Sequence, residues 1–265
     1  MSAIVETRKV SSASTDSRLR FEFEQSGAIH IRHLRLDDKR AYEFGITCNT
    51  CQFWFERKAG ANESVSLEDV ADALNHGLDS LEEETTQRIA DRLPSGEYFA
   101  ILTRILPKLV QPSASDDYFS QEQVRLWGID TFWGLAHDPR TEYYRTGSKV
   151  FNERTELFEF VVPMFPHGWL KPDSLAAYTD RLESGERPTA VALSFLDVKS
   201  PAVLNGKQDP TITEHWCFPS LLIDGHHKTY AAAKLGKEMT LLTFLAPSEG
   251  TADPGQIETL LTLLR

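Results

Sequence analysis

The chain has 265 residues, of which 41% are hydrophobic and 25% charged, so one large or two modest globular domains are expected. Its formal net charge is −11, and its lysines and arginines are scattered, which disfavours nucleic acids and anionic membranes as partners. There is no apolar run near the roughly 20 residues of a membrane span, and three cysteines make no disulfide framework, so we expect a cytoplasmic protein.

The N-terminal part predicts a tail followed by strands. Residues 1–18 lack an apolar pattern and the core of a signal peptide, and indicate a disordered tail. Residues 19–36 alternate apolar and polar side chains around Ser26-Gly27, as in a half-buried hairpin. Residues 42–58 form two strand-like arms around a Cys-Asn-Thr-Cys turn.

Helices are expected next. Ser66 and Asp69 resemble a capping box at the start of a helix that reaches Leu81. Residues 96–109 predict a second helix, which Pro107 bends or ends, and residues 120–139 a third, interrupted at Gly128. Together, residues 19–154 predict a mixed α/β region.

Residues 155–265 predict a second unit with the order β-α-β-β-α-β-α, hence an α+β fold. Its first helix begins near Pro172 and stops at Gly185, and its second helix ends at Gly236. The expected strands are residues 157–165, 189–198, 216–223 and 239–246, and the last helix is 253–265.

The junction between the third of these strands and its helix concentrates polar chemistry: Asp224, Gly225, His226, His227 and Lys228. A helix N-terminus attracts anions, a glycine permits close approach, and the lysine, expected near the surface of the first turn, adds positive charge. The histidines suit hydrogen bonding or proton transfer, and the aspartate suits Mg²⁺ or a proton. The pattern favours a phosphate site; the alternative is that the aspartate only caps the helix.

The stretch LLIDGHHKTYAAAKLG at residues 221–236 resembles the signature of the ParB/sulfiredoxin-like superfamily, and residues 161–165 and 171–195 are similar to the strand, helix and strand that precede it. The resemblance covers residues 157–247. It implies that Gly225, His226, His227 and Lys228 hold a nucleotide phosphate, with Asp224 and the two histidines as catalytic residues.

The chain departs from the superfamily pattern at several positions, and these departures indicate which members it resembles most. Lys228 stands where arginine is usual, which keeps the charge and loses the bidentate fork. No cysteine stands at His226, which disfavours sulfinic-acid repair, and the DGHH form is closest to the free-serine-kinase-like members. The glutamate that those members carry before their first helix is absent, and His167 and Asp173 are the residues nearby that suit a base.

The sequence therefore predicts a nucleotide-dependent small-molecule phosphotransferase or a nucleotide hydrolase. ATP, ADP or CTP with Mg²⁺ is the expected cofactor. The alternative is a non-catalytic nucleotide-binding switch or a partner-binding protein.

Cys48 and Cys51 form a second candidate site. Two thiols in a tight turn suit Zn²⁺, with His30 and His33 as a second pair only if their strand is bulged or ends there. A redox dithiol is another interpretation, although no βαβ pattern surrounds the pair. The third interpretation is two ordinary, half-buried cysteines.

Overall fold

The computed structural model describes residues 3–26, 29–58, 65–128, 142–201 and 212–264. In this part of the chain, nine strands form one large mixed sheet and four strands form a smaller antiparallel sheet. The large sheet contains β1 (Ala3–Ser12), β6 (Gly96–Ile105), β7 (Lys108–Val110), β8 (Tyr143–Asn152), β9 (Thr155–Val162), β10 (Thr189–Ser194), β11 (Asp197–Lys199), β12 (Glu214–Asp224) and β13 (Met239–Leu245). The small sheet contains β2 (Leu19–Ser26), β3 (Ile29–Leu36), β4 (Lys39–Ile46) and β5 (Phe55–Arg57).

The large sheet brings early and late parts of the chain together. Its strand order is β1-β6-β13-β10-β12-β9-β8-β7, with β11 beside β12. Strand β10 runs parallel to β13 and antiparallel to β12, which runs parallel to β9. The unit boundary expected between residues 154 and 155 falls in the turn between β8 and β9, and strands on both sides of it pair in this one sheet.

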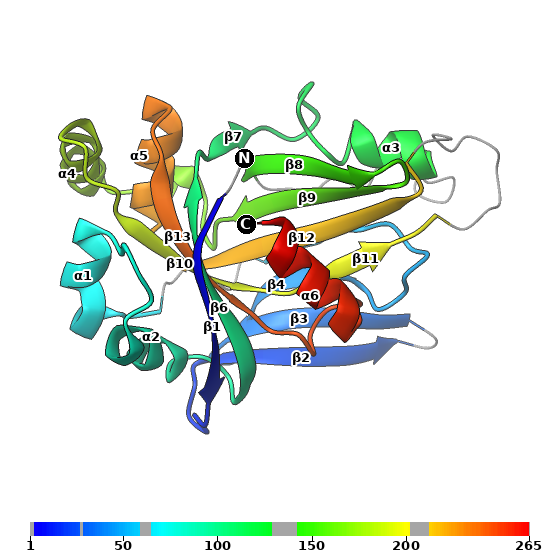
Figure 1. Cartoon of the computed structure of the whole chain (residues 1–265), viewed down its shortest axis with the longest axis horizontal. Coiled ribbons are helices and arrows are strands. Elements are labelled where there is room, and N and C mark those ends of the chain that lie inside the picture. The colour runs from blue at the N-terminus through cyan, green and yellow to red at the C-terminus, as the bar shows by residue number, and fades with distance from the viewer. Residues whose placement is uncertain (1–2, 27–28, 59–64, 129–141, 202–211, 265) are drawn as a thin grey trace.

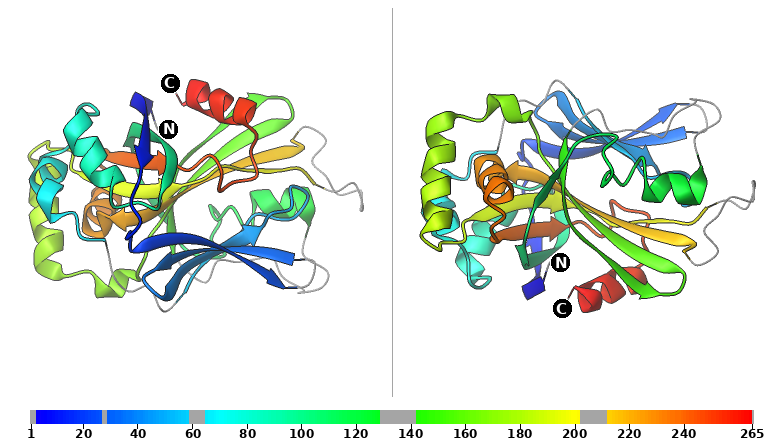
Figure 2. Two further views of the ribbon diagram at one scale, coloured as in Figure 1. Left: turned by 90° about the horizontal axis from the view of Figure 1, so that it is seen from below. Right: turned by 90° about the horizontal axis from the view of Figure 1, so that it is seen from above.

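Both faces of the large sheet are covered. Strands β10 and β13 are buried at every residue, and their nearly continuous apolar sequences are typical of strands covered on both sides. The small sheet lies against one face (Figure 2), where Phe44 of β4 stacks on Phe195 with ring centroids 4.5 Å apart. On the other face, Ile257 and Leu260 of the last helix pack in a cluster with Phe218.

The helices gather mainly at one end of the large sheet, where Figure 1 shows α1, α2, α4 and α5. The helical segments are the 3₁₀ helices η1 (Glu68–Val70) and η2 (His167–Trp169), and the α-helices α1 (Ala71–His76), α2 (Glu83–Ala90), α3 (Glu122–Trp127), α4 (Pro172–Glu183), α5 (His226–Leu235) and α6 (Pro254–Leu263). Helix α6 begins with a capping box in which Asp253 and Gln256 each accept the other's backbone N–H.

The prediction of an α+β fold is confirmed, and residues 155–264 follow the expected order β9, α4, β10, β12, α5, β13, α6, with the short β11 added. The hairpin over residues 19–36 and the two arms that flank the cysteine turn are also present. Helix α3 ends where Gly128 was expected to interrupt it; residues 129–141 lie outside the described residues.

The prediction of a disordered tail over residues 1–18 is wrong for residues 3–12. These residues form β1, which pairs antiparallel with β6 along its whole length. Polar residues occupy the middle of β1 from Glu6 to Lys9, so the strand lacks the apolar signal of a buried one.

Two helix predictions also need correction. Residues 96–105 form strand β6, held between β1 and β13, because an apolar run without clear periodicity fits a buried strand as well as a helix. The helix expected to reach Leu81 ends at His76, and Ser66 makes no capping box because η1 begins at Glu68 without a side-chain cap.

Candidate functional site

Strand β12 turns into helix α5 at Gly225, and this position requires glycine. Its φ of +91° lies in the left-handed region, and an added Cβ would stand 2.5 Å from Cβ and 2.7 Å from Cα of Ala190. The absence of a side chain therefore lets this strand-to-helix junction, residues 224–228, lie directly against β10. It is called the β12–α5 corner, or the corner.

Helix α5 begins with unpaired backbone donors. Its first turn closes when the Thr229 N–H and hydroxyl donate to the Gly225 carbonyl, at 2.9 and 3.0 Å. The N–H groups of residues 226–228 precede this bond and have no partner within the helix, which gives the end a partial positive charge. Asp224 does not cap the helix: Gly225 is the N-cap, and no side chain makes a cap hydrogen bond.

Lys228 lies inside the protein, so the expectation of a near-surface lysine is wrong. It is 3% exposed. Its ammonium donates to the Thr189 carbonyl at 3.0 Å and to Asp224 Oδ2 at 3.5 Å. Burial lowers the pKa of Lys228, and the Asp224 carboxylate opposes that shift. The cation is therefore already balanced by a carboxylate within the corner.

The ring of His226 accepts a hydrogen bond from the backbone. Its Nε2 receives the Met164 N–H at 2.9 Å, and the ring stacks on Phe165 with centroids 4.0 Å apart. Burial lowers the pKa of His226 to about 3. The ring is neutral near pH 7, and because Nε2 accepts, its proton stands on Nδ1.

His227 has the same arrangement in a more open place. Its Nε2 accepts the Lys171 N–H at 3.0 Å, and burial lowers the pKa of His227. The two histidines therefore fix the segment between β9 and α4 on the start of α5. His227 is half-buried, and because its Nε2 accepts, its neutral ring carries a proton on Nδ1.

A cavity of about 300 Å³ opens beside the corner, at the lower end of the size range of small-molecule sites. It is lined by Val65, Ser66, Leu67, Glu68, Ala71, Asn75, Tyr178, Asp224 and Lys228. Two acidic residues, Asp224 and Glu68, are part of this lining, and the Tyr178 hydroxyl donates to Asn75 Oδ1 at 2.8 Å. Carboxylate oxygens are ligands that Mg²⁺ prefers, so the acidic residues in the lining fit the expected metal.

His167 belongs to a second polar group that the sequence does not reveal. Its Nδ1 contacts the Glu142 carboxylate, and its Nε2 lies 2.8 Å from the Tyr144 hydroxyl. Its ring also lies 4.9 Å from that of Tyr230 on α5. Burial lowers the pKa of His167, while Glu142 opposes the shift. Asp173, the other residue expected to suit a base, is exposed in the first turn of α4.

Cys48 and Cys51 lie in a turn between β4 and β5, and both are partly exposed. The Cys51 N–H donates to the Cys48 carbonyl at 3.3 Å, and Cys48 Sγ lies 3.1 Å from the Thr50 hydroxyl. His30 is exposed on β3, whereas His33 is buried between Glu24 and Glu43. Within the described ranges, no three His, Cys, Asp or Glu side chains are grouped to hold a metal, and the zinc interpretation stays a prediction.

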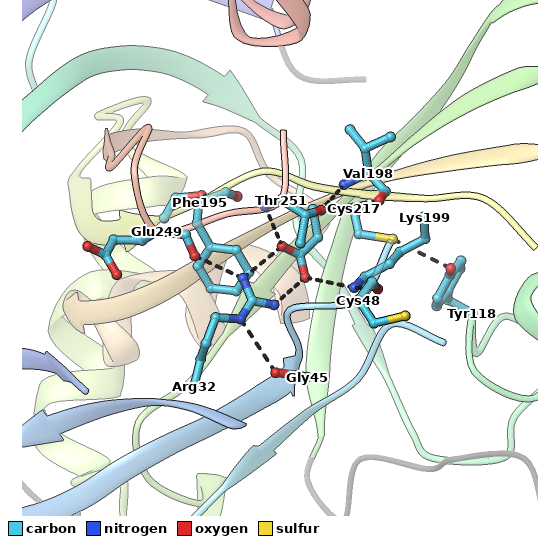
Figure 3. Close-up of polar contacts among 12 residues, drawn as sticks. Arg32, Gly45, Cys48, Tyr118, Phe195, Val198, Lys199, Cys217, Glu249 and Thr251 are labelled. Atoms are coloured by element: carbon cyan, nitrogen blue, oxygen red, sulfur yellow. Dashed lines mark hydrogen bonds and ion pairs between the residues drawn. The ribbon is translucent and has the colours of Figure 1, made fainter. Parts of the chain in front are cut away.

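A buried ionic network joins the two sheets (Figure 3). Arg32 of β3 forms a bidentate ion pair with Asp197 of β11, at 2.8 and 2.5 Å, and its guanidinium lies 5.3 and 5.0 Å from the ring centroids of Phe44 and Phe195. Lys199 lies 3.6 Å from the same carboxylate and donates to the Cys48 carbonyl at 2.8 Å. Charged residues at alternate positions of an otherwise apolar strand, as in Asp197-Val-Lys199, are the sequence signal for such a network.

Comparisons of the chain with protein-family models, with curated proteins and with solved structures gave no match. Among the described residues, no helix has the length and apolar character needed to cross a membrane.

Proposed function

We propose that this chain binds a nucleoside phosphate with Mg²⁺ at the β12–α5 corner and transfers the phosphoryl group to a small molecule or to water. The observation that carries the proposal is the start of α5 itself. The helix begins at Gly225 with three backbone N–H groups that have no partner within the helix, and the adjoining residues Asp224 and Lys228 line a cavity. Backbone donors at a helix start, a lysine and carboxylates for Mg²⁺ are the groups that phosphoryl transfer uses.

Each residue has a distinct role in this proposal. The N–H groups of residues 226–228 and the His227 Nδ1–H donate to phosphate oxygens. Asp224 holds Mg²⁺, which offsets the phosphate charge when bound, and Glu68 accepts the proton. Buried Lys228 keeps the Asp224 carboxylate in place, and His226 fixes the segment after β9.

Glu68 takes the place of the glutamate that the resemblance leads one to expect before α4. It lines the cavity from η1, a segment outside the part of the chain that carries the resemblance. A carboxylate in the lining of the cavity that also contains Asp224 suits the acceptance of a proton from an attacking hydroxyl.

A non-catalytic nucleotide-binding switch is the second candidate. It is favoured by the hydrogen bonds of His226 and His227, whose Nε2 atoms both accept backbone N–H groups from the segment between β9 and α4. A phosphate that accepts a hydrogen bond from the Nδ1–H of His227 would change how strongly His227 binds the segment between β9 and α4. No covalent bond in the ligand would be made or broken.

The test is to incubate purified protein and Mg²⁺ with ATP, ADP and CTP, measuring binding by calorimetry and phosphate release or transfer by ³¹P NMR. Turnover supports the enzyme, and binding without turnover supports the switch. If none of the nucleotides, pyrophosphate or inorganic phosphate binds, both candidates fail.

A further inference from the structure

The turn that carries Cys48 and Cys51 has the backbone geometry for a disulfide. The bond from the Cys51 N–H to the Cys48 carbonyl is the first-to-fourth hydrogen bond of a β-turn, which brings the outer Cα atoms within about 7 Å. Disulfides close over Cα separations of roughly 4.4–6.8 Å. Both cysteines are partly exposed at the two ends of this turn, so their side chains start from neighbouring positions.

The turn is fixed in place from outside. Its successive carbonyls accept hydrogen bonds from Lys199 Nζ to Cys48 at 2.8 Å, from the Ser200 N–H to Asn49 at 2.8 Å, and from the Trp127 indole to Thr50 at 3.5 Å. A turn anchored through its backbone keeps its cysteine side chains close together and requires little rearrangement when they join.

Cys217 offers an internal contrast. It is fully buried on β12, and its Sγ lies 3.5 Å from the Tyr118 hydroxyl. A dissolved reagent reaches Cys48 and Cys51, which are partly exposed, and does not reach Cys217 in the folded protein.

We infer that Cys48 and Cys51 are a reversible thiol–disulfide site, which exchanges with low-molecular-weight disulfides. One thiolate attacks a sulfur of the small disulfide, forms a mixed disulfide and releases one small thiolate. The second cysteine then attacks the protein sulfur of the mixed disulfide and displaces the other small thiolate. The two cysteines are oxidised, the small disulfide is reduced to two thiols, and the two protons pass from the cysteines to the released thiolates. This inference is independent of the proposed nucleotide site.

The experiment uses the full chain, reduced, treated with a chelator, and then incubated with mixtures of oxidised and reduced glutathione. The folded protein is quenched in acid, unfolded, alkylated and analysed by mass spectrometry with peptide mapping. The wild type should lose two hydrogen atoms as oxidised glutathione rises, regain them with reductant, and be alkylated only at Cys217. Cys217→Ser should form the same disulfide.

The single variants identify the intermediate. Cys48→Ser and Cys51→Ser should each carry one glutathione on the remaining cysteine of the turn and form no internal disulfide. The inference is overturned if the wild type collects glutathione adducts without closing the bond, or if the disulfide contains Cys217 or links two chains. It is also overturned if the protein as purified carries zinc and both thiols resist exchange until chelation, which would establish the metal site instead.

Discussion

The backbone N–H of Met164 donates a 2.9 Å hydrogen bond to Nε2 of His226, a residue 62 positions later in the chain. A parallel bond joins Lys171 to His227 at 3.0 Å. The two imidazoles therefore act as neutral acceptors that seat the segment after β9 on the start of α5. The shape of the corner depends on their staying unprotonated.

Replacing His226 with glutamine should reduce the acid sensitivity of folding. Burial lowers the pKa of His226 from 6.5 to about 3, so around pH 5 the unfolded chain binds a proton that the folded ring does not. The stability gained from the neutral ring is complete above about pH 6.5 and is lost as the pH falls toward 3. Down to about pH 5 the loss is roughly 2 kcal/mol.

Urea unfolding near pH 7.5 and pH 5 measures this difference. His226→Gln should lose less stability on acidification than the wild type does. His30→Gln, at an exposed histidine on β3, is the matched control and should lose as much as the wild type. An unchanged loss in His226→Gln would contradict the account.

Replacing Gly225 with alanine should be far more harmful than the same change at Gly185. Both have left-handed φ angles, +91° and +95°, so both substitutions bear a backbone strain on the order of 1 kcal/mol. Only at Gly225 does the new Cβ overlap Ala190; at Gly185 nothing lies within 4 Å. Thermal unfolding of the two variants isolates the overlap, and equal losses would show that the corner is less tightly packed than described.

Loss of Asp197 should destabilise the protein more than loss of Arg32. Burial opposes the ionisation of Asp197, but Arg32 and Lys199 outweigh it, so the pKa of the carboxyl lies below its usual range. Asp197→Asn removes the carboxylate that both cations contact, at a cost of about 3–5 kcal/mol. Arg32→Met leaves Lys199 Nζ 3.6 Å from Asp197 and should cost less. Denaturant titration gives the free energy of unfolding of both variants. A larger loss in Arg32→Met than in Asp197→Asn would contradict this description of the network.

Asp224→Asn and Glu68→Gln should lower turnover more than nucleotide binding if the proposed reaction occurs. Asp224→Asn removes the proposed Mg²⁺ ligand and Glu68→Gln the proposed proton acceptor, and loss of a general base typically costs about 10²-fold or more in rate. The control is Glu82→Gln, the same change at an exposed residue just before α2. Steady-state kinetics measures the loss of turnover in the three variants, and calorimetry measures their loss of nucleotide affinity. Turnover that survives in both cavity variants would remove these residues from the mechanism.

The sequence predicted the second half of the fold because glycines and prolines there mark clear ends. Gly185 and Gly236 end α4 and α5, and the strands between them are short apolar runs. Strand β6 was missed because nothing in its own residues specifies β1 and β13 as neighbours, and such pairing is decided by the rest of the fold.

At the corner, the sequence supplied the residue types but not their partners. Asp224, Lys228 and the histidines do meet at the start of α5, yet Lys228 is directed inward to Thr189 and the histidines accept backbone N–H groups. Contacts of this kind, like the Arg32–Asp197 pair 165 residues apart, arise from the packing of distant segments. No local pattern encodes them.

The most direct test of the central claim is a ¹H–¹⁵N NMR titration of the wild-type protein with Mg²⁺ and ATP, ADP or CTP. The account predicts saturable shifts of the backbone amides of residues 226–228, with those of residues 255–257 in the first turn of α6 unchanged, because a capping box occupies that helix end. Amides of α5 that do not move at saturating nucleotide, or that move no more than those of α6, would contradict a phosphate site at this corner.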